Sequence, residues 1–97
     1  MKLGIDLIRL ILLNIEENDG LKVDDILSFN YDFKTVALHV EVLAQAGYLD
    51  AKVHFANRHI PAAIGYAYMT WTGYDFLDAH KSDNVWARAK QATKKKH

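Results

Sequence analysis

The side chains best suited to metal chemistry are two histidines and a carboxylate near the middle of the chain. His54 and His59 follow Asp50 closely in the sequence, and imidazole and carboxylate groups are ordinary ligands of Zn²⁺. A closed structural zinc site needs four ligands, however, and the chain contains no cysteine to complete one. Asp78 and His80 lack the i, i+4 spacing of a metalloprotease pair. We therefore predict no metal site.

The other carboxylates do not form a catalytic pattern. Asp24 and Asp25 are neighbours in a predicted short helix, so their side chains point in different directions and cannot act together as general acid and base. The chain has no glycine-rich phosphate loop, no nucleophile elbow and no Cys–His pair. We therefore expect neither enzymatic activity nor a cofactor.

Length and composition predict one folded domain. The chain has 97 residues, of which 51% are hydrophobic, so it is long enough to bury a core and too apolar to stay disordered. Asp6 and Arg9 interrupt the apolar N-terminal run, which argues against a signal peptide and a membrane span. The lack of cysteine fits a reducing compartment, and we expect a cytoplasmic location.

The charges are unevenly distributed although the net charge is zero. Residues 1–50 carry four Lys/Arg and nine Asp/Glu, whereas residues 51–97 carry eight and three. This asymmetry is typical of an anion-facing half or a head-to-tail contact, and a solvated tail explains it as well. We separate residues 94–97, a basic tail, from a domain at residues 1–93.

Three helices are predicted in the first half of the chain. Residues 3–18 repeat apolar side chains with the helical period. Leu10 and Leu13 widen this apolar face, which suits either a dimer contact or a deeply buried helix. A short helix at residues 23–28 follows, and Asp32 is placed to cap a third helix.

The second half predicts a hairpin followed by helices. Residues 49–55 alternate apolar and polar side chains, as a half-buried strand does. Residues 57–65, which contain the chain's one proline, predict a loop, and residues 66–71 predict the returning strand. Thr72 is expected to cap a fourth helix, and residues 84–92 to form a fifth. The residues expected to face the core from the first strand are Leu49, Ala51, Val53 and Phe55.

Two motifs connect these elements to known regulators. The third helix ends at Gly47 and passes directly into a strand, and it resembles the recognition-helix motif of ArsR-type repressors in Val36-x-x-His39-Val40-x-x-Leu43-x-x-Ala46-Gly47. The end of the hairpin resembles a MarR- and PadR-type motif in Tyr68-Met69-Thr70-x-x-Gly73. Their order implies an α+β winged helix-turn-helix fold, with three helices, a two-stranded wing and one or two C-terminal helices.

A wider resemblance covers nearly the whole chain. The sequence is similar to domain-of-unknown-function family 2513, which consists of small bacterial and phage-encoded proteins. This resemblance implies a winged-helix fold and a mobile-element setting, and it implies no activity. It rests on the segments Asp6–Glu16, His39–Gly47, Thr70–Asp78 and Val85-Trp86.

The resemblance to ArsR-type domains implies which positions of the third helix face outward. Lys34 is suited to a phosphate, Thr35 to a phosphate or a base edge, and Ala37 to a thymine methyl group. Leu38 stands where ArsR-type members commonly carry a basic residue. Glu41 repels the DNA backbone unless it accepts a hydrogen bond from a cytosine.

The hairpin offers further cations. Lys52 and His54 are expected on its outward face, and Arg58 and His59 at its tip, where wings touch the DNA backbone or the minor groove. A wing that is merely solvated is the alternative. We expect His39 to be a buried, hydrogen-bonded core residue. The late aromatic residues are predicted to pack in the core and hairpin rather than to stack on single-stranded nucleic acid. They are Tyr66, Tyr68, Trp71, Tyr74, Phe76 and Trp86.

These features predict a dimeric regulator of phage or mobile-element type that binds double-stranded DNA. The alternative is a protein-interaction module on the same fold, in which a phage protein adapts or inhibits a host complex. An exposed apolar patch would mark that interface. Its expected members are Leu10, Leu13, Leu38 and Val42.

Overall fold

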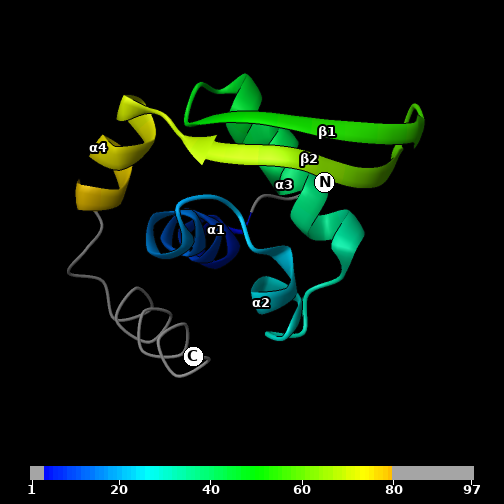
Figure 1. Cartoon of the computed structure of the whole chain (residues 1–97), viewed down its shortest axis with the longest axis horizontal. Helices are drawn as coiled ribbons and strands as arrows, with labels where there is room; N and C mark the ends of the chain where they lie inside the picture. The colour runs from blue at the N-terminus through cyan, green and yellow to red at the C-terminus, as the bar shows by residue number, and fades with distance from the viewer. Residues whose placement is uncertain (1–3, 80–97) are drawn as a thin grey trace.

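The described chain forms three helices, a β-hairpin and a fourth helix, in the order that the sequence predicts. The computed structural model describes residues 4–79, so the predicted fifth helix and the basic tail lie outside the described residues. Within these limits the protein is α+β, with four helices and one two-stranded antiparallel sheet, a layout compatible with a winged helix (Figure 1). The elements are α1 (Ile5–Asn18), α2 (Val23–Leu27), α3 (Phe33–Gln45), β1 (Leu49–Asn57), β2 (Ile60–Met69) and α4 (Trp71–Ala79).

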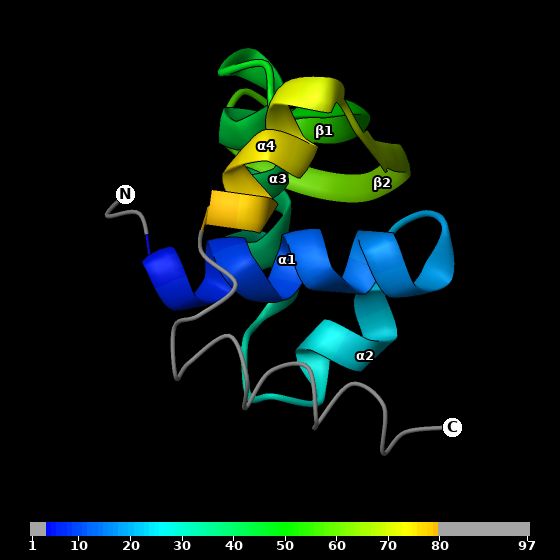
Figure 2. The ribbon, with the colours of Figure 1, turned by 90° about the vertical axis from the view of Figure 1, so that its left-hand side faces the viewer.

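Helix α1 is the centre of the core. It contacts α2, α3, α4 and β2, and Figure 2 shows it crossing the molecule between α4 and α2. Every residue from 7 to 15 is consequently buried. Leu10 is 5% exposed and Leu13 is fully buried, so the expectation that they form an exposed interface is wrong. The wide apolar face exists because neighbouring elements cover the helix from several sides.

Helix α3 begins and ends where its sequence signals predict. The Asp32 carboxylate accepts a hydrogen bond of 2.7 Å from the Thr35 backbone N–H and so caps the first turn. At the other end Gly47 adopts φ 91°. The Tyr48 N–H donates to the Leu43 carbonyl, and the Gly47 N–H to the Ala44 carbonyl. This is the Schellman pattern, and it turns the chain directly into β1.

The hairpin is longer and its turn tighter than the sequence predicts. Asn57 pairs with Ile60, and only Arg58 and His59 form the turn. The predicted loop at residues 57–65 is therefore wrong. Pro61 lies inside β2 opposite Phe55, a position open to proline because both strands of a two-stranded sheet are edge strands.

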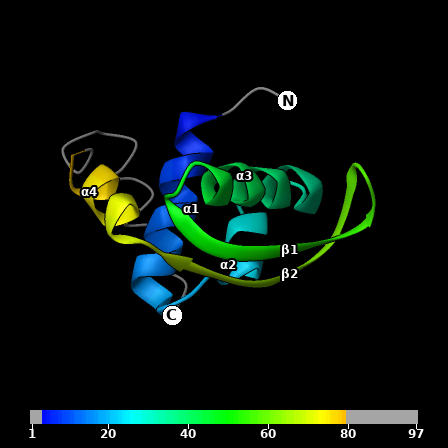
Figure 3. The same cartoon turned by 90° about the horizontal axis from the view of Figure 1, so that it is seen from above.

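Phe55 does not belong to the core. It is 36% exposed, whereas Leu49 and Val53 on the same face of β1 are buried. The pairing register shifts on both sides of Phe55. Figure 3 shows α3 lying along the hairpin, whose tip reaches past the N-terminal end of the helix. Phe55 thus continues the inner face of β1 beyond the packed core.

Thr70, rather than Thr72, caps α4. The Thr70 hydroxyl oxygen accepts a hydrogen bond of 3.2 Å from the Gly73 N–H, and the hydroxyl donates to the Gly47 carbonyl at 2.6 Å. Trp71 is the first residue of α4 and not part of a strand. A Cβ on Gly73 would overlap the carbonyl oxygen of Tyr48. The hairpin-end motif therefore joins the end of α3 to the start of α4. Among the described helices, none has the length and apolar character needed to cross a bilayer.

Candidate functional site

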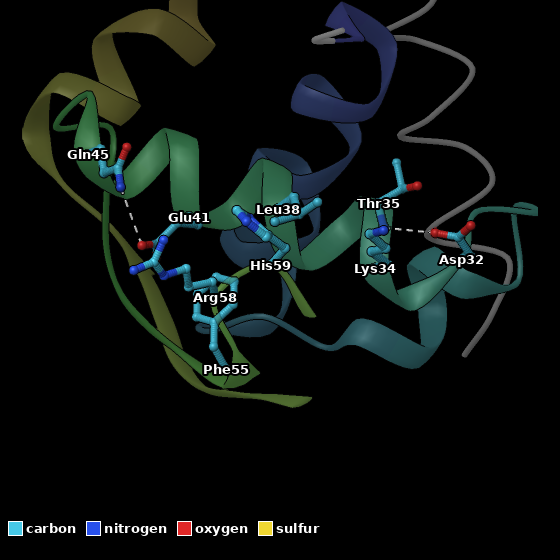
Figure 4. Close-up of a pocket in the computed structure, with 9 residues that line it drawn as sticks. All are labelled: Asp32, Lys34, Thr35, Leu38, Glu41, Gln45, Phe55, Arg58 and His59. Atoms are coloured by element: carbon cyan, nitrogen blue, oxygen red, sulfur yellow. Dashed lines mark hydrogen bonds between the residues drawn. The ribbon is translucent and has the colours of Figure 1, made fainter. Parts of the chain in front are cut away.

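An open groove separates the outer face of α3 from the tip of the hairpin (Figure 4). Its volume is about 800 Å³. The start and outer face of α3 form one wall, and the end of β1 with the turn forms the other. The lining residues are Asp32, Lys34, Thr35, Leu38, Glu41, Gln45, Phe55, Arg58 and His59.

The groove contains five of the seven side chains that the sequence nominates for DNA contact. These five are Lys34, Thr35, Leu38, Arg58 and His59. Three of them are on α3 and two are in the turn of the hairpin, on the far side of β1 in the sequence. They line one groove because α3 packs along the hairpin. The sequence predicts Arg58 and His59 at the tip of a long loop, and the structure places both in the tight turn that joins two paired strands.

Ala37 and Lys52 do not line the groove. Ala37 is completely buried, so its predicted contact with a thymine methyl group is wrong. It packs in the core beside Val36 and Val40, because the inward face of α3 is wider than the motif implies. Lys52 is exposed on the outer face of the hairpin, opposite Tyr66.

The start of α3 is held by a short chain of hydrogen bonds. Hydrogen bonds from Thr35, first from its side chain and then from its backbone, lower the pKa of Asp32 below its ordinary value of 3.8. The Thr35 carbonyl in turn accepts from Nδ1–H of His39 at 2.8 Å. These bonds fix the backbone on which Lys34 and Thr35 face the groove.

His39 supports the site from behind. Its ring is 2% exposed, and its Nε2 accepts a hydrogen bond of 3.0 Å from the Gly4 N–H. Because Nδ1 donates and Nε2 accepts, both ring nitrogens are satisfied. The predicted structural role of His39 is confirmed.

The charges in the groove are balanced. Lys34 and Arg58 supply two cations, and Asp32 and Glu41 supply two carboxylates. Figure 4 shows the Arg58 side chain extending from the turn toward Glu41. The Gln45 amide donates to Glu41 at 3.3 Å. An anion entering the groove must therefore compete with carboxylates for both cations.

The candidate metal ligands do not converge in the described part of the chain. No group of three or more His, Asp or Glu side chains in residues 4–79 is arranged to hold a metal ion. His54 is on the outer face of β1 with Asp50, whereas His59 belongs to the turn and lines the groove.

Sequence reasoning missed an exposed aromatic surface. Tyr66 and Tyr68 are 44% and 51% exposed, and Trp71 and Tyr74 are 86% and 40% exposed. The prediction of core packing is therefore wrong for these four residues, whereas Tyr66 and Tyr68 do pack against each other on the hairpin. Ala67 is buried between the two tyrosines, because successive side chains of a strand point to opposite faces. The alternation from residue 66 to residue 69 was the signal that could have revealed it.

Comparisons with known proteins place the chain in a family without assigning it a function. A family model described as "Hypothetical protein (DUF2513)" matches residues 2–97. An uncharacterized protein of Haemophilus influenzae is 33% identical over 99 residues, which cover 99% of this chain and 81% of that protein. No solved structure matches the chain significantly. The match extends over α3, the hairpin and the groove between them, and the chain belongs to the DUF2513 family.

Proposed function

We propose that this protein is a winged-helix regulator that binds double-stranded DNA, with α3 as the recognition helix and the β1–β2 hairpin as the wing. The observation that supports this is the groove, which is lined by Lys34 and Thr35 at the start of α3 and by Arg58 and His59 at the hairpin tip. A recognition helix and a wing need such a gap between them, because a sugar–phosphate strand runs between the major groove and the adjacent minor groove.

In this arrangement α3 enters the major groove, which is wide enough for a helix. Lys34 contacts a phosphate and Thr35 a phosphate or a base edge. Arg58 approaches the backbone or a narrow minor groove from the hairpin tip. Glu41 lies farther along α3 than Lys34 and Thr35, next to the Arg58 side chain (Figure 4), and we expect its carboxylate to accept a hydrogen bond from a cytosine amino group.

The balanced charge of the groove predicts an unusual salt dependence. Two phosphate-neutralising cations per protomer give a slope of log K against log salt of about −2. Non-specific affinity should therefore be weak, and the base contacts must supply most of the discrimination. We expect a homodimer, in which a second set of contacts doubles this slope; its interface cannot use Leu10 or Leu13, since both are buried.

Fluorescence anisotropy with labelled duplex tests the proposal. We expect sub-micromolar binding to DNA from the upstream region of the gene, roughly tenfold tighter than to a scrambled duplex. The double variant Lys34→Glu with Arg58→Glu should abolish binding. Lys52→Glu is the control, because it makes the same charge change as each of these two substitutions but lies outside the groove. Absence of binding even at low salt would refute the DNA function.

A protein-interaction module remains the second candidate because the groove also has apolar and acidic walls. Leu38 is half-buried beside the partly exposed Phe55, and Glu41 is close by. Such a surface suits a protein segment as well as DNA. Leu38→Ala should then weaken a complex seen by size-exclusion chromatography while leaving DNA affinity little changed, because it removes apolar surface and adds no charge. The reverse pattern supports DNA binding.

A further inference from the structure

The outer face of the hairpin carries rings and a cation on the side away from α3. Asp50, Lys52 and His54 alternate with core residues along β1 and are all exposed. The register places Tyr68 opposite Asp50 and Tyr66 opposite Lys52. This face shares no residue with the lining of the groove.

The two tyrosine rings form an ordered pair. Their centroids are 6.1 Å apart and their planes differ by 24°. About half of each residue is exposed, so ring surface remains available to a ligand.

The turn between α1 and α2 holds the Tyr68 ring in place. A Cβ added to Gly20 would lie 3.3 Å from the Tyr68 ring, so the α1–α2 turn supports this ring from one side. The Leu21 N–H donates to the Ala67 carbonyl and fixes the turn against β2. An ordered ring loses less conformational entropy on binding than a mobile one.

His54 extends the row of rings. A Cβ added to Gly65 would lie 2.8 Å from Nε2 of His54, so the imidazole lies over the glycine, where a larger residue would displace it. The face therefore presents His54, Tyr66 and Tyr68, with Lys52 beside Tyr66.

We propose that the outer face of the hairpin binds single-stranded nucleic acid, by stacking unpaired bases on Tyr66 and Tyr68 and holding a phosphate with Lys52. Sequence-tolerant binding of single strands combines aromatic platforms with positive charge in this way. A duplex cannot use the face, because its bases are stacked on one another. Asp50 repels phosphate at the Tyr68 end and places the backbone toward Lys52.

Anisotropy of labelled oligothymidylate and oligouridylate, each about 12 nucleotides long, tests the proposal, and the two oligomers distinguish DNA from RNA. Tyr66→Ala and Tyr68→Ala should each weaken binding at least about fivefold. Tyr66→Phe with Tyr68→Phe should retain binding, since the rings remain. Tyr74→Ala removes an exposed tyrosine of α4 and is the matched control. Lys52→Gln should lower the salt dependence, and Asp50→Asn should raise affinity.

Two results would overturn this proposal without touching the duplex function. One is that the wild-type protein binds neither oligomer at low salt. The other is that the tyrosine-to-alanine variants lose a dimer seen by size-exclusion chromatography and leave oligomer binding unchanged, which would make the face a contact between copies. Circular dichroism of each variant shows whether the fold is intact. Conversely, Lys34→Glu with Arg58→Glu should leave oligomer binding unchanged, because those residues line the groove.

Discussion

Asp32 connects the stability of α3 to the chemistry of the groove at the scale of a single residue. Its carboxylate caps the helix and lines the groove at once. Hydrogen bonds from Thr35 lower its pKa in the folded protein. The charged form is therefore favoured by folding, and the same charge repels phosphate near Lys34.

The lowered pKa of Asp32 makes part of the stability depend on pH. Since the folded pKa is below the unfolded one, the contribution is fully present above the unfolded value, near 3.8, and is lost as the pH falls through the folded value. Asp32→Asn retains an oxygen for the Thr35 N–H and does not titrate. We expect urea midpoints of the wild type to fall relative to this variant below about pH 4. Parallel midpoint curves for the two proteins would contradict the assignment.

The junction between α3, the hairpin and α4 is the decisive feature at the scale of elements. The Thr70 hydroxyl joins Gly47 to Gly73, and Tyr48 packs against Phe76 with ring centroids 5.3 Å apart. This explains why Thr70 and Gly73 stand three residues apart at the end of the hairpin. Thr70 caps α4, and Gly73 allows the Tyr48 carbonyl to approach the helix.

Substitutions of two threonines on either side of Trp71 test this junction. Thr70→Ala should lower the free energy of unfolding by about 1–2 kcal/mol, because it removes the α4 cap and the hydrogen bond to the Gly47 carbonyl. Thr72→Ala should change the free energy of unfolding little, because Thr72 follows the cap as a residue of α4 and its side chain is exposed to solvent. Urea denaturation measures both variants. Equal losses would mean that Thr70 has no special role.

Local signals explain which elements the sequence could predict. Asp32 and Gly47 act on their own helix ends, so the bounds of α3 followed from residue types alone. The strand containing Pro61 did not follow, because proline and Gly65 are also loop signals, and only the pairing with β1 distinguishes the two cases. The burial of Leu10 and Leu13 depends on elements distant in the sequence that pack over α1. Only some of the groove residues could be predicted, because the sequence does not show which side of α3 other elements cover. Ala37, for example, can be assigned to the core only from the packing of the whole helix.

At the scale of the molecule the hairpin separates two surfaces of different chemistry. On its inner side, Phe55 and the Arg58–His59 turn lie beyond the packed core, and they line the groove together with α3. Its outer side carries Tyr66, Tyr68 and Lys52. The groove is open and balanced in charge, and duplex DNA is the ligand that we propose for it, whereas the outer face has exposed rings, for which we propose unpaired bases. One thin sheet thus keeps the two proposed ligands apart.

This separation predicts that duplex and single strand bind at the same time. We expect labelled oligothymidylate to bind with unchanged affinity when unlabelled upstream duplex is saturating, and anisotropy should rise further because the complex is larger. Lys34→Glu with Arg58→Glu should remove the extra rise, and Tyr66→Ala with Tyr68→Ala should remove the oligomer signal itself. Displacement of the oligomer by duplex would instead mean that both ligands use one surface. In that case the groove is the simpler choice, because it alone combines cations from α3 and from the hairpin tip.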